Sequence, residues 1–227
     1  MTLDRRDPTR PRRVRPLLAA LMAGALVAAG CGGGPRVTIA RDVAPFDRIE
    51  ISDSLDVRVV PGSGGQVRVR AGRDVMDRVR TESSGGVLRL DIVDRGIVIG
   101  PDPLGDVRIE LPVDSLSGVL IDGSGEAEIS GIDEDRFELE VRGAGDVTAS
   151  GTVDHLSATI QGAADAELDQ LAARTADLTV QGAADADVRV SDELEVTVQG
   201  AADVSYRGDP IVRSVIEGAG DLRRERP

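Results

Sequence analysis

A four-residue phrase that returns six times constrains the fold of this chain more than any other feature. It consists of Gly, Ser or Ala, Gly or Ala, and an acidic residue, and successive copies are 20, 19, 20, 18 and 18 residues apart. A regular period of this length is typical of a stacked structural unit rather than of a helical bundle or a heptad repeat. The copies begin at Gly123, Gly143, Gly162, Gly182, Gly200 and Gly218.

The residues on both sides of each phrase alternate between apolar and polar. Two and four positions before the six glycines, eleven of twelve residues are apolar, and the residues between them are mostly polar or charged. Alternation with period two places one face inward and the other in water, so we predict a strand before each phrase. The alternation resumes after the acidic residue, which predicts a second strand and makes each phrase a corner between two strands.

Units that supply the same strands in the same order bury their apolar faces by stacking strand on like strand, about 4.8 Å apart. The sequence therefore predicts an all-β fold, a parallel β-helix (solenoid) of 18–20-residue coils over residues 116–222. An antiparallel meander or a propeller also contains such strands and corners. A propeller blade, however, needs about 40 residues and four strands, so the β-helix is favoured.

The region of residues 37–115 alternates less regularly, and we interpret it as an N-terminal β cap of the same domain, which spans 37–222. The PGSGG segment starting at Pro61 predicts a hairpin between the strands on either side of it. Val75, Met76 and Val79 have helical spacing, which predicts a short helical turn. Residues 223–227 form a charged tail. Strands are predicted at 48–52, 56–60, 66–70, 86–93 and 106–113.

The first 30 residues have the pattern of a secretory signal peptide. Six Arg precede an apolar run from Leu17 to Ala29, which is too short to span a membrane. The AAGC sequence ending at Cys31 resembles a bacterial lipobox, in which the cysteine is acylated and becomes the first mature residue. Cys31 is the sole cysteine, and residues 31–36 form a Gly-rich tether. The alternatives are an ordinary signal peptide cut before a stray cysteine and a buried apolar helix.

The composition excludes several classes of partner. The formal net charge is −13, and removal of residues 1–30, which carry six Arg and two Asp, changes it to −17. Nucleic acid should repel so acidic a chain. Phe46, Phe137 and Tyr206 are the sole aromatic residues, which argues against grooves that stack sugars or bases on aromatic rings.

The six corner phrases, together with FDRIEISDSLDVRVV from Phe46 and VMDRVRTESSGGVLRLDI from Val75, resemble the putative auto-transporter adhesin, head GIN domain family. The resemblance covers residues 37–222. It implies a right-handed parallel β-helix, found in bacterial exported proteins or lipoproteins, with no established enzymatic activity. It carries no catalytic motif onto this chain.

The acidic residues of the corners are the candidate site. In register they would form a ladder that could bind a divalent cation weakly, since Ca²⁺ prefers several oxygen ligands. The alternative, which we favour because the Ca²⁺-binding nonapeptide consensus is absent, is that each carboxylate accepts a hydrogen bond from its own turn. We predict no other metal site and no cofactor. The candidates are Glu126, Asp146, Asp165, Asp185, Asp203 and Asp221.

Other polar residues favour a structural interpretation. Gln161, Gln181 and Gln199 would stack as an amide ladder, and His155 is interpreted as a solvated turn residue. We therefore expect a non-catalytic, lipid-anchored protein of the bacterial cell envelope, on its periplasmic or cell-surface face, that binds a protein or glycan as an interaction or adhesion module. The alternatives are a polysaccharide-active enzyme with paired carboxylates and a purely structural envelope component.

Overall fold

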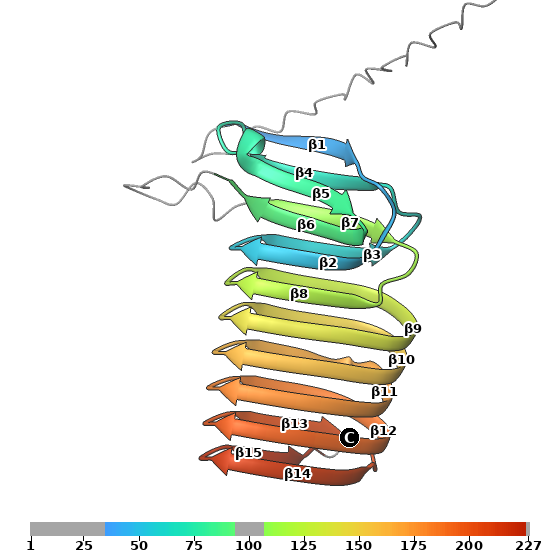
Figure 1. Ribbon diagram of the computed structural model, residues 1–227, viewed down its shortest axis with the longest axis vertical. Coiled ribbons are helices and arrows are strands. Elements are labelled where there is room, and N and C mark those ends of the chain that lie inside the picture. Colours follow the sequence, from blue (N-terminus) through green and yellow to red (C-terminus); the bar gives the residue numbers. More distant parts are fainter. Residues whose placement is uncertain (1–34, 94–106, 226–227) are drawn as a thin grey trace, which may run out of the picture.

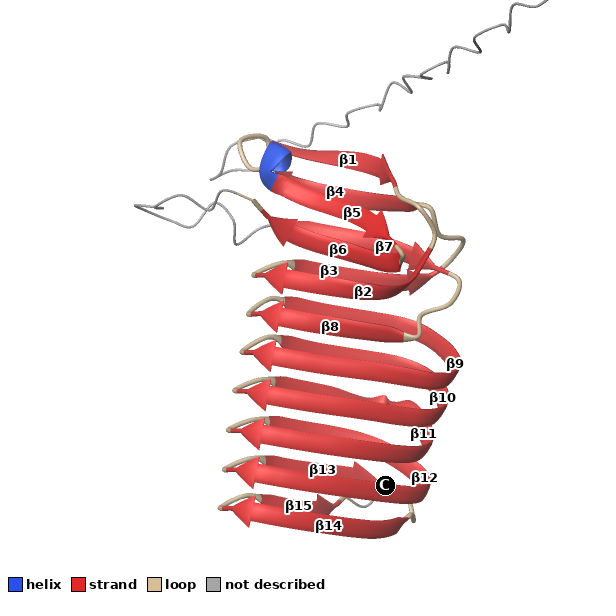
Figure 2. Ribbon diagram, viewed as in Figure 1, coloured by secondary structure: helices blue, strands red, loops and turns tan. Residues whose placement is uncertain are grey.

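The computed structural model describes residues 35–93 and 107–225, and these form a tall stack of flattened coils (Figure 1). Within these residues, strands make up nearly all of the structure, and a single turn of 3-10 helix lies near the N-terminal end (Figure 2). The strands are β1 (Arg36–Asp42), β2 (Phe46–Asp53), β3 (Asp56–Pro61), β4 (Gln66–Gly72), β5 (Val79–Ser84), β6 (Gly86–Ile92), β7 (Arg108–Val113), β8 (Gly118–Gly123), β9 (Glu126–Gly143), β10 (Asp146–Gly162), β11 (Asp165–Gly182), β12 (Asp185–Gly200), β13 (Asp203–Arg207), β14 (Ile211–Gly218) and β15 (Asp221–Arg224), and the 3-10 helix η1 is Met76–Arg78.

The regular coils confirm the predicted parallel β-helix. Each of β9 to β12 runs along the back of the stack, bends, and returns along the front as one continuous strand (Figure 1). Neighbouring coils pair in parallel, so that Ile160 lies opposite Val141 on one side and Val180 on the other. The coils differ in length by up to two residues, and register shifts near the bend, such as the one between Ala149 and Gly151, absorb the difference.

The corner phrases stack on one another at the opposite edge from the bend. From Gly143 onward, the N–H of the residue after each corner glycine donates to the carbonyl of the corner glycine one coil earlier, for example Ala183 N to Gly162 O at 2.9 Å and Ala201 N to Gly182 O at 2.8 Å. The corner glycines from Gly143 onward have a positive φ, which is +120° at Gly182. A Cβ on Gly182 would lie 2.2 Å from the carbonyl oxygen of Gly162, so the corner requires glycine for its close approach as well as for its backbone angle.

The core is a single layer of aliphatic side chains between the front and back of each coil. The inward positions predicted from the alternation are buried in every coil from β8 to β12; Val141, Ile160, Val180 and Val198 each have an exposed fraction of 0%. Phe137 is the largest fully buried side chain. The inward positions of β14 are not fully buried: β14 lies at the end of the stack, and its Ile216 is 41% exposed.

The order of the N-terminal coils in space is not their order in the sequence. The coil made of β2 and β3 pairs in parallel with β8 and β9 on one side and with β6 and β7 on the other. The predicted hairpin of the two strands around Pro61 is therefore wrong. β7 lies between β3 and β4, and β4 pairs antiparallel with β1 and β7. The predicted helical turn is confirmed as η1.

The N-terminal end of the stack is closed. Arg41 on β1 reaches across to η1 and β5, where its guanidinium donates to the carbonyl of Met76 at 2.8 Å and to that of Val79. Burial lowers the pKa of Arg41 from its ordinary value. Arg41, which is half-buried, thereby ties β1 to η1 and β5 across the top of the core.

Candidate functional site

The six predicted acidic residues lie in one column. Each is the first residue of its strand and is exposed, and Cα register pairs Glu126 with Asp146, Asp185 with both Asp165 and Asp203, and Asp203 with Asp221. The sequence reading missed a further member, Asp56. It begins β3 and precedes Val57, which pairs with Ala127.

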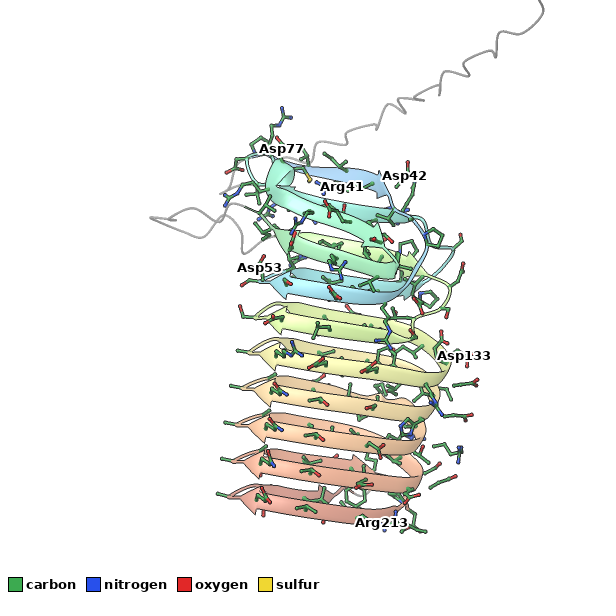
Figure 3. All side chains as sticks on the ribbon, viewed as in Figure 1. Arg41, Asp42, Asp53, Asp77, Asp133 and Arg213 are labelled. Atoms are coloured by element: carbon green, nitrogen blue, oxygen red, sulfur yellow. The ribbon has the colours of Figure 1, made fainter. Side chains whose placement is uncertain are left out.

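The sequence pattern did not identify Asp56 because the corner before it does not match the repeated four-residue phrase. The corner Asp53–Asp56 reads DSLD, and Asp53 takes the place of the glycine with a φ of +75°. The N–H of Ser124 donates to the Asp53 carbonyl at 3.2 Å, as in the other corners. Apolar and polar residues alternate on both sides of DSLD as they do around the later corners, and this pattern could have identified Asp56. Figure 3 shows Asp53 at the edge of the stack, in line with those corners.

Two of these carboxylates accept hydrogen bonds from the following coil. The N–H of Asp165 donates to Asp146 Oδ1 at 3.4 Å, and the N–H of Asp221 donates to Asp203 Oδ1 at 3.2 Å. These bonds join neighbouring coils, whereas the favoured sequence interpretation placed them within one turn. Among residues 35–93 and 107–225, no group of three or more His, Cys, Asp or Glu side chains could hold a metal ion.

We expect Ca²⁺ to act weakly on this column. Because like charges repeat at about the strand spacing of 4.8 Å, a divalent cation bridging two neighbours should relieve their repulsion. Millimolar CaCl₂ should then raise the melting temperature by a degree or more above the shift from NaCl of equal ionic strength, measured by circular dichroism. Equal shifts of the melting temperature in the two salts would show that Ca²⁺ acts on the column only by charge screening.

The front of the stack carries two uncharged columns over β10, β11 and β12. Thr159 pairs with Thr179, which pairs with Thr197, and all three side chains point outward next to the predicted Gln column. We call these outward residues, together with the Gln residues two positions further along each strand, the Thr/Gln face. It consists of Thr159, Gln161, Thr179, Gln181, Thr197 and Gln199.

His155 lies within β10, not in a turn as predicted. Its Nδ1 is 3.0 Å from the hydroxyl oxygen of Thr175, and its Nε2 is 3.5 Å from a carboxylate oxygen of Asp177. Asp154 instead faces Arg174, with 3.7 Å between Oδ1 and Nε. The neighbouring strand β11 thus supplies both partners of His155, and the sequence-adjacent Asp154 is not one of them.

A concavity of about 560 Å³ lies on the back of the N-terminal coils, and the sequence reading did not foresee it. It gathers four arginines from β3, β4 and β7, but acidic side chains accompany them: Arg68 lies 2.7 Å from Glu110, and Arg58 lies 2.9 Å from Glu128. The lining therefore carries four cations and four carboxylates. These are Arg58, Arg68, Arg70, Arg108, Asp56, Glu110, Glu126 and Glu128.

One carboxyl on the back of the stack has a perturbed pKa. Burial raises the pKa of Asp187, and the nearby Glu225 and Asp169 raise it further, against the opposing effects of Ser205 and Arg207. Arg207 bridges two of these groups, with its Nη2 2.8 Å from Glu225 and its Nη1 bonded to Asp169. Burial is thus the largest cause of the raised pKa of Asp187, and the neighbouring carboxylates on the same strand surface add to it.

Cys31 and the predicted signal peptide of residues 1–30 lie outside the described residues. Within the described part of the chain, no helix is long and apolar enough to cross a membrane.

Comparison with known proteins agrees with this architecture. The model of the family described as putative auto-transporter adhesin, head GIN domain, matches residues 45–210. No curated protein matches the chain in sequence.

Several solved structures share the fold. A putative adhesin from Bacteroides fragilis is 16% identical, with a TM-score of 0.66, over 84% of this chain and 97% of its own. A putative lipid binding protein from Parabacteroides distasonis is 17% identical, with a TM-score of 0.51, over 87% and 98%. A putative adhesin from the same species is 17% identical, with a TM-score of 0.50, over 85% and 98%.

Proposed function

Because the chain belongs to the putative auto-transporter adhesin, head GIN domain family, we propose that it is a non-catalytic adhesion or interaction module of the bacterial cell envelope, anchored by a lipid on Cys31. The observation that carries this proposal is the Thr/Gln face. Hydroxyl and amide groups repeat there in register on three successive coils, on a protein that is otherwise strongly acidic.

The chemistry of the Thr/Gln face suits recognition of an extended partner. Hydroxyls and amides both donate and accept hydrogen bonds, and their repeat along the stack follows the strand spacing of about 4.8 Å. An uncharged partner surface, such as a glycan or a polar protein segment, meets no charge repulsion within these columns. A partner lying along the stack could therefore bond to several coils at once.

The concavity on the back gives no support to the alternative of a polysaccharide-active enzyme. Such enzymes use two carboxyl groups that face one substrate bond. In the concavity three of the four acidic side chains are instead ion-paired with arginines, and Asp56 Oδ2 is 3.8 Å from Arg108 Nε.

Binding through the Thr/Gln face can be tested with variants of one coil. Replacing Thr179 and Gln181 with Arg should lower the adhesion of protein-coated beads to isolated envelope material at least about tenfold, since two long cations would cover the centre of the face. The control is Glu167, which lies near the start of β11, on the back of the same coil. The Glu167→Arg variant should bind as the wild type does. Equal binding by both variants would reject the Thr/Gln face as the binding surface.

Lipid anchoring follows from the AAGC sequence and the tether, and it has its own test. In cells that express the full chain, Cys31→Ser should move the protein from the membrane fraction to the soluble fraction, because the acyl acceptor is lost. Membrane retention of this variant, measured by fractionation and detergent partitioning, would contradict a lipid on Cys31. The adhesion proposal would remain open in that case, because it depends on the folded domain.

A further inference from the structure

The two ends of the stack differ in how they are finished. Arg41, η1 and β5 close the N-terminal end, whereas β14 at the other end pairs only with β12 within the described residues. The three large apolar side chains that are exposed in the described part of the chain all lie on β14: Ile211 (68%), Val215 (55%) and Ile216 (41%). Figure 3 shows Arg213 on this last strand, at the edge of the stack.

An edge strand of this kind presents unpaired backbone N–H and C=O groups together with apolar side chains, which is a template for pairing with another strand. Edge strands that avoid such pairing are commonly short or carry inward-pointing charges or Pro. β14 has eight residues, and its charged side chains, Arg213 and Glu217, point outward on either side of Val215. β14 therefore lacks these features that prevent edge pairing, and the arrangement of its charges indicates which strand could pair with it.

The charges of β14 are complementary to a second copy of β14 running in the opposite direction. In an antiparallel pair with a two-fold axis at Val215, Val215 faces its own copy. Arg213 then faces Glu217 of the other copy, twice by symmetry, since the two lie equally far from Val215 in the sequence. Ile216 lies opposite Ser214 on the inner side, so the open end of each core covers the other.

We propose that two copies of this chain associate end to end through their β14 strands, antiparallel and centred on Val215. The contact is isologous, so it closes after two copies and forms no fibre. It covers the inward Ile216, sets the outward Val215 of each copy against the other, and joins the front sheets of two stacks into one continuous sheet. Two Thr/Gln faces are thereby presented side by side on one surface.

Neighbouring registers lack this complementarity. An axis at Ser214 would place Arg213 opposite Val215 and Glu217 opposite Ile211, and an axis at Arg213 or Glu217 would set like charges against each other. Within its own chain Arg213 is ion-paired with Glu193. A guanidinium has five N–H donors, so Arg213 can keep that bond and still reach the Glu217 of the other copy.

Charge exchange tests the pairing and its register together. The protein to use begins at Pro35, which removes Cys31 and the predicted signal peptide and keeps every residue that the structure describes. At about 0.1 mM and low salt, sedimentation equilibrium should show a dimer. Arg213→Glu and Glu217→Arg should each raise the dissociation constant at least about tenfold, because each turns two attractions into repulsions. The double exchange should restore it to within about threefold.

Variants at the axis provide an independent measurement. Val215→Lys sets two cations against each other and should give monomers, while Thr179→Lys, two coils inward in the same column, should leave the dimer unchanged. The native chain has one cysteine, Cys31, so a protein starting at Pro35 with Val215→Cys has a single thiol. Under air it should form a disulfide-linked dimer much faster than Thr179→Cys does.

A monomeric wild type at this concentration would overturn the proposal, and so would a dimer that Val215→Lys does not disrupt. Failure of the double exchange to restore a dimer would also overturn it if the variant retains its circular dichroism spectrum. If the exchanged strand unfolds, the rate of cross-linking of Val215→Cys relative to Thr179→Cys decides: equal rates would overturn the pairing.

Discussion

Replacing Val180 with Asp should prevent the chain from folding. Val180 has an exposed fraction of 0% and lies between Ile160 and Val198 on the neighbouring coils. A carboxylate there would lose its water without gaining a partner, which costs several kcal/mol. That loss is comparable with the whole free energy of unfolding of a typical domain, about 5–15 kcal/mol. We expect little soluble protein, and no β-sheet signal in circular dichroism of what can be purified.

The adjacent residue serves as the control. Gln181 points outward on the same strand, between Gln161 and Gln199, so Gln181→Glu adds one charge in water and should change the free energy of unfolding by less than about 1 kcal/mol. Soluble yield and circular dichroism compare the two variants, and urea denaturation measures the stability of Gln181→Glu. Similar tolerance at both positions would contradict the inward register of the coils.

Replacing Gly182 with Ala should destabilise the protein by about 2–5 kcal/mol, since two penalties combine. The φ of +120° strains any residue with a side chain. The added Cβ would also lie 2.2 Å from the carbonyl oxygen of Gly162, which is backbone and cannot rotate away. Moving apart would break the hydrogen bond between Ala183 N and that carbonyl, now 2.9 Å. The lowered urea midpoint is the measurement.

Gly64→Ala is the matched substitution without these penalties. A Cβ there would have its nearest contact at 3.7 Å, with the carbonyl oxygen of Pro112. The change should alter stability by less than about 0.5 kcal/mol, and it could raise stability by reducing the freedom of the unfolded chain. If Gly182→Ala proved as harmless as Gly64→Ala, the corners could not be stacked as closely as the structure has them.

The regular coils could be read from the sequence because their determinants are local and repeated. Alternation states which side chains of a strand point inward, and the phrase starting at Gly143 or Gly162 marks where the strand turns. When six units repeat in phase, the neighbour of each strand follows as well, since like strands must stack. The register of the acidic column and of the Gln column follows from the same repeat.

Only the tertiary structure decided the arrangement of the N-terminal coils, where the sequence repeat is absent. Alternation in β2, β3, β6 and β7 shows that each has one buried face, but it does not say which strand lies beside which. The chain therefore places the β2–β3 coil between two coils that follow it in sequence. It sets Asp53 at the corner position that glycine takes in the later coils, and it brings Arg58, Arg68, Arg70 and Arg108 into one concavity. Backbone pairing is nearly independent of side-chain identity, so the choice among equally alternating strands depends on which arrangement covers the whole core.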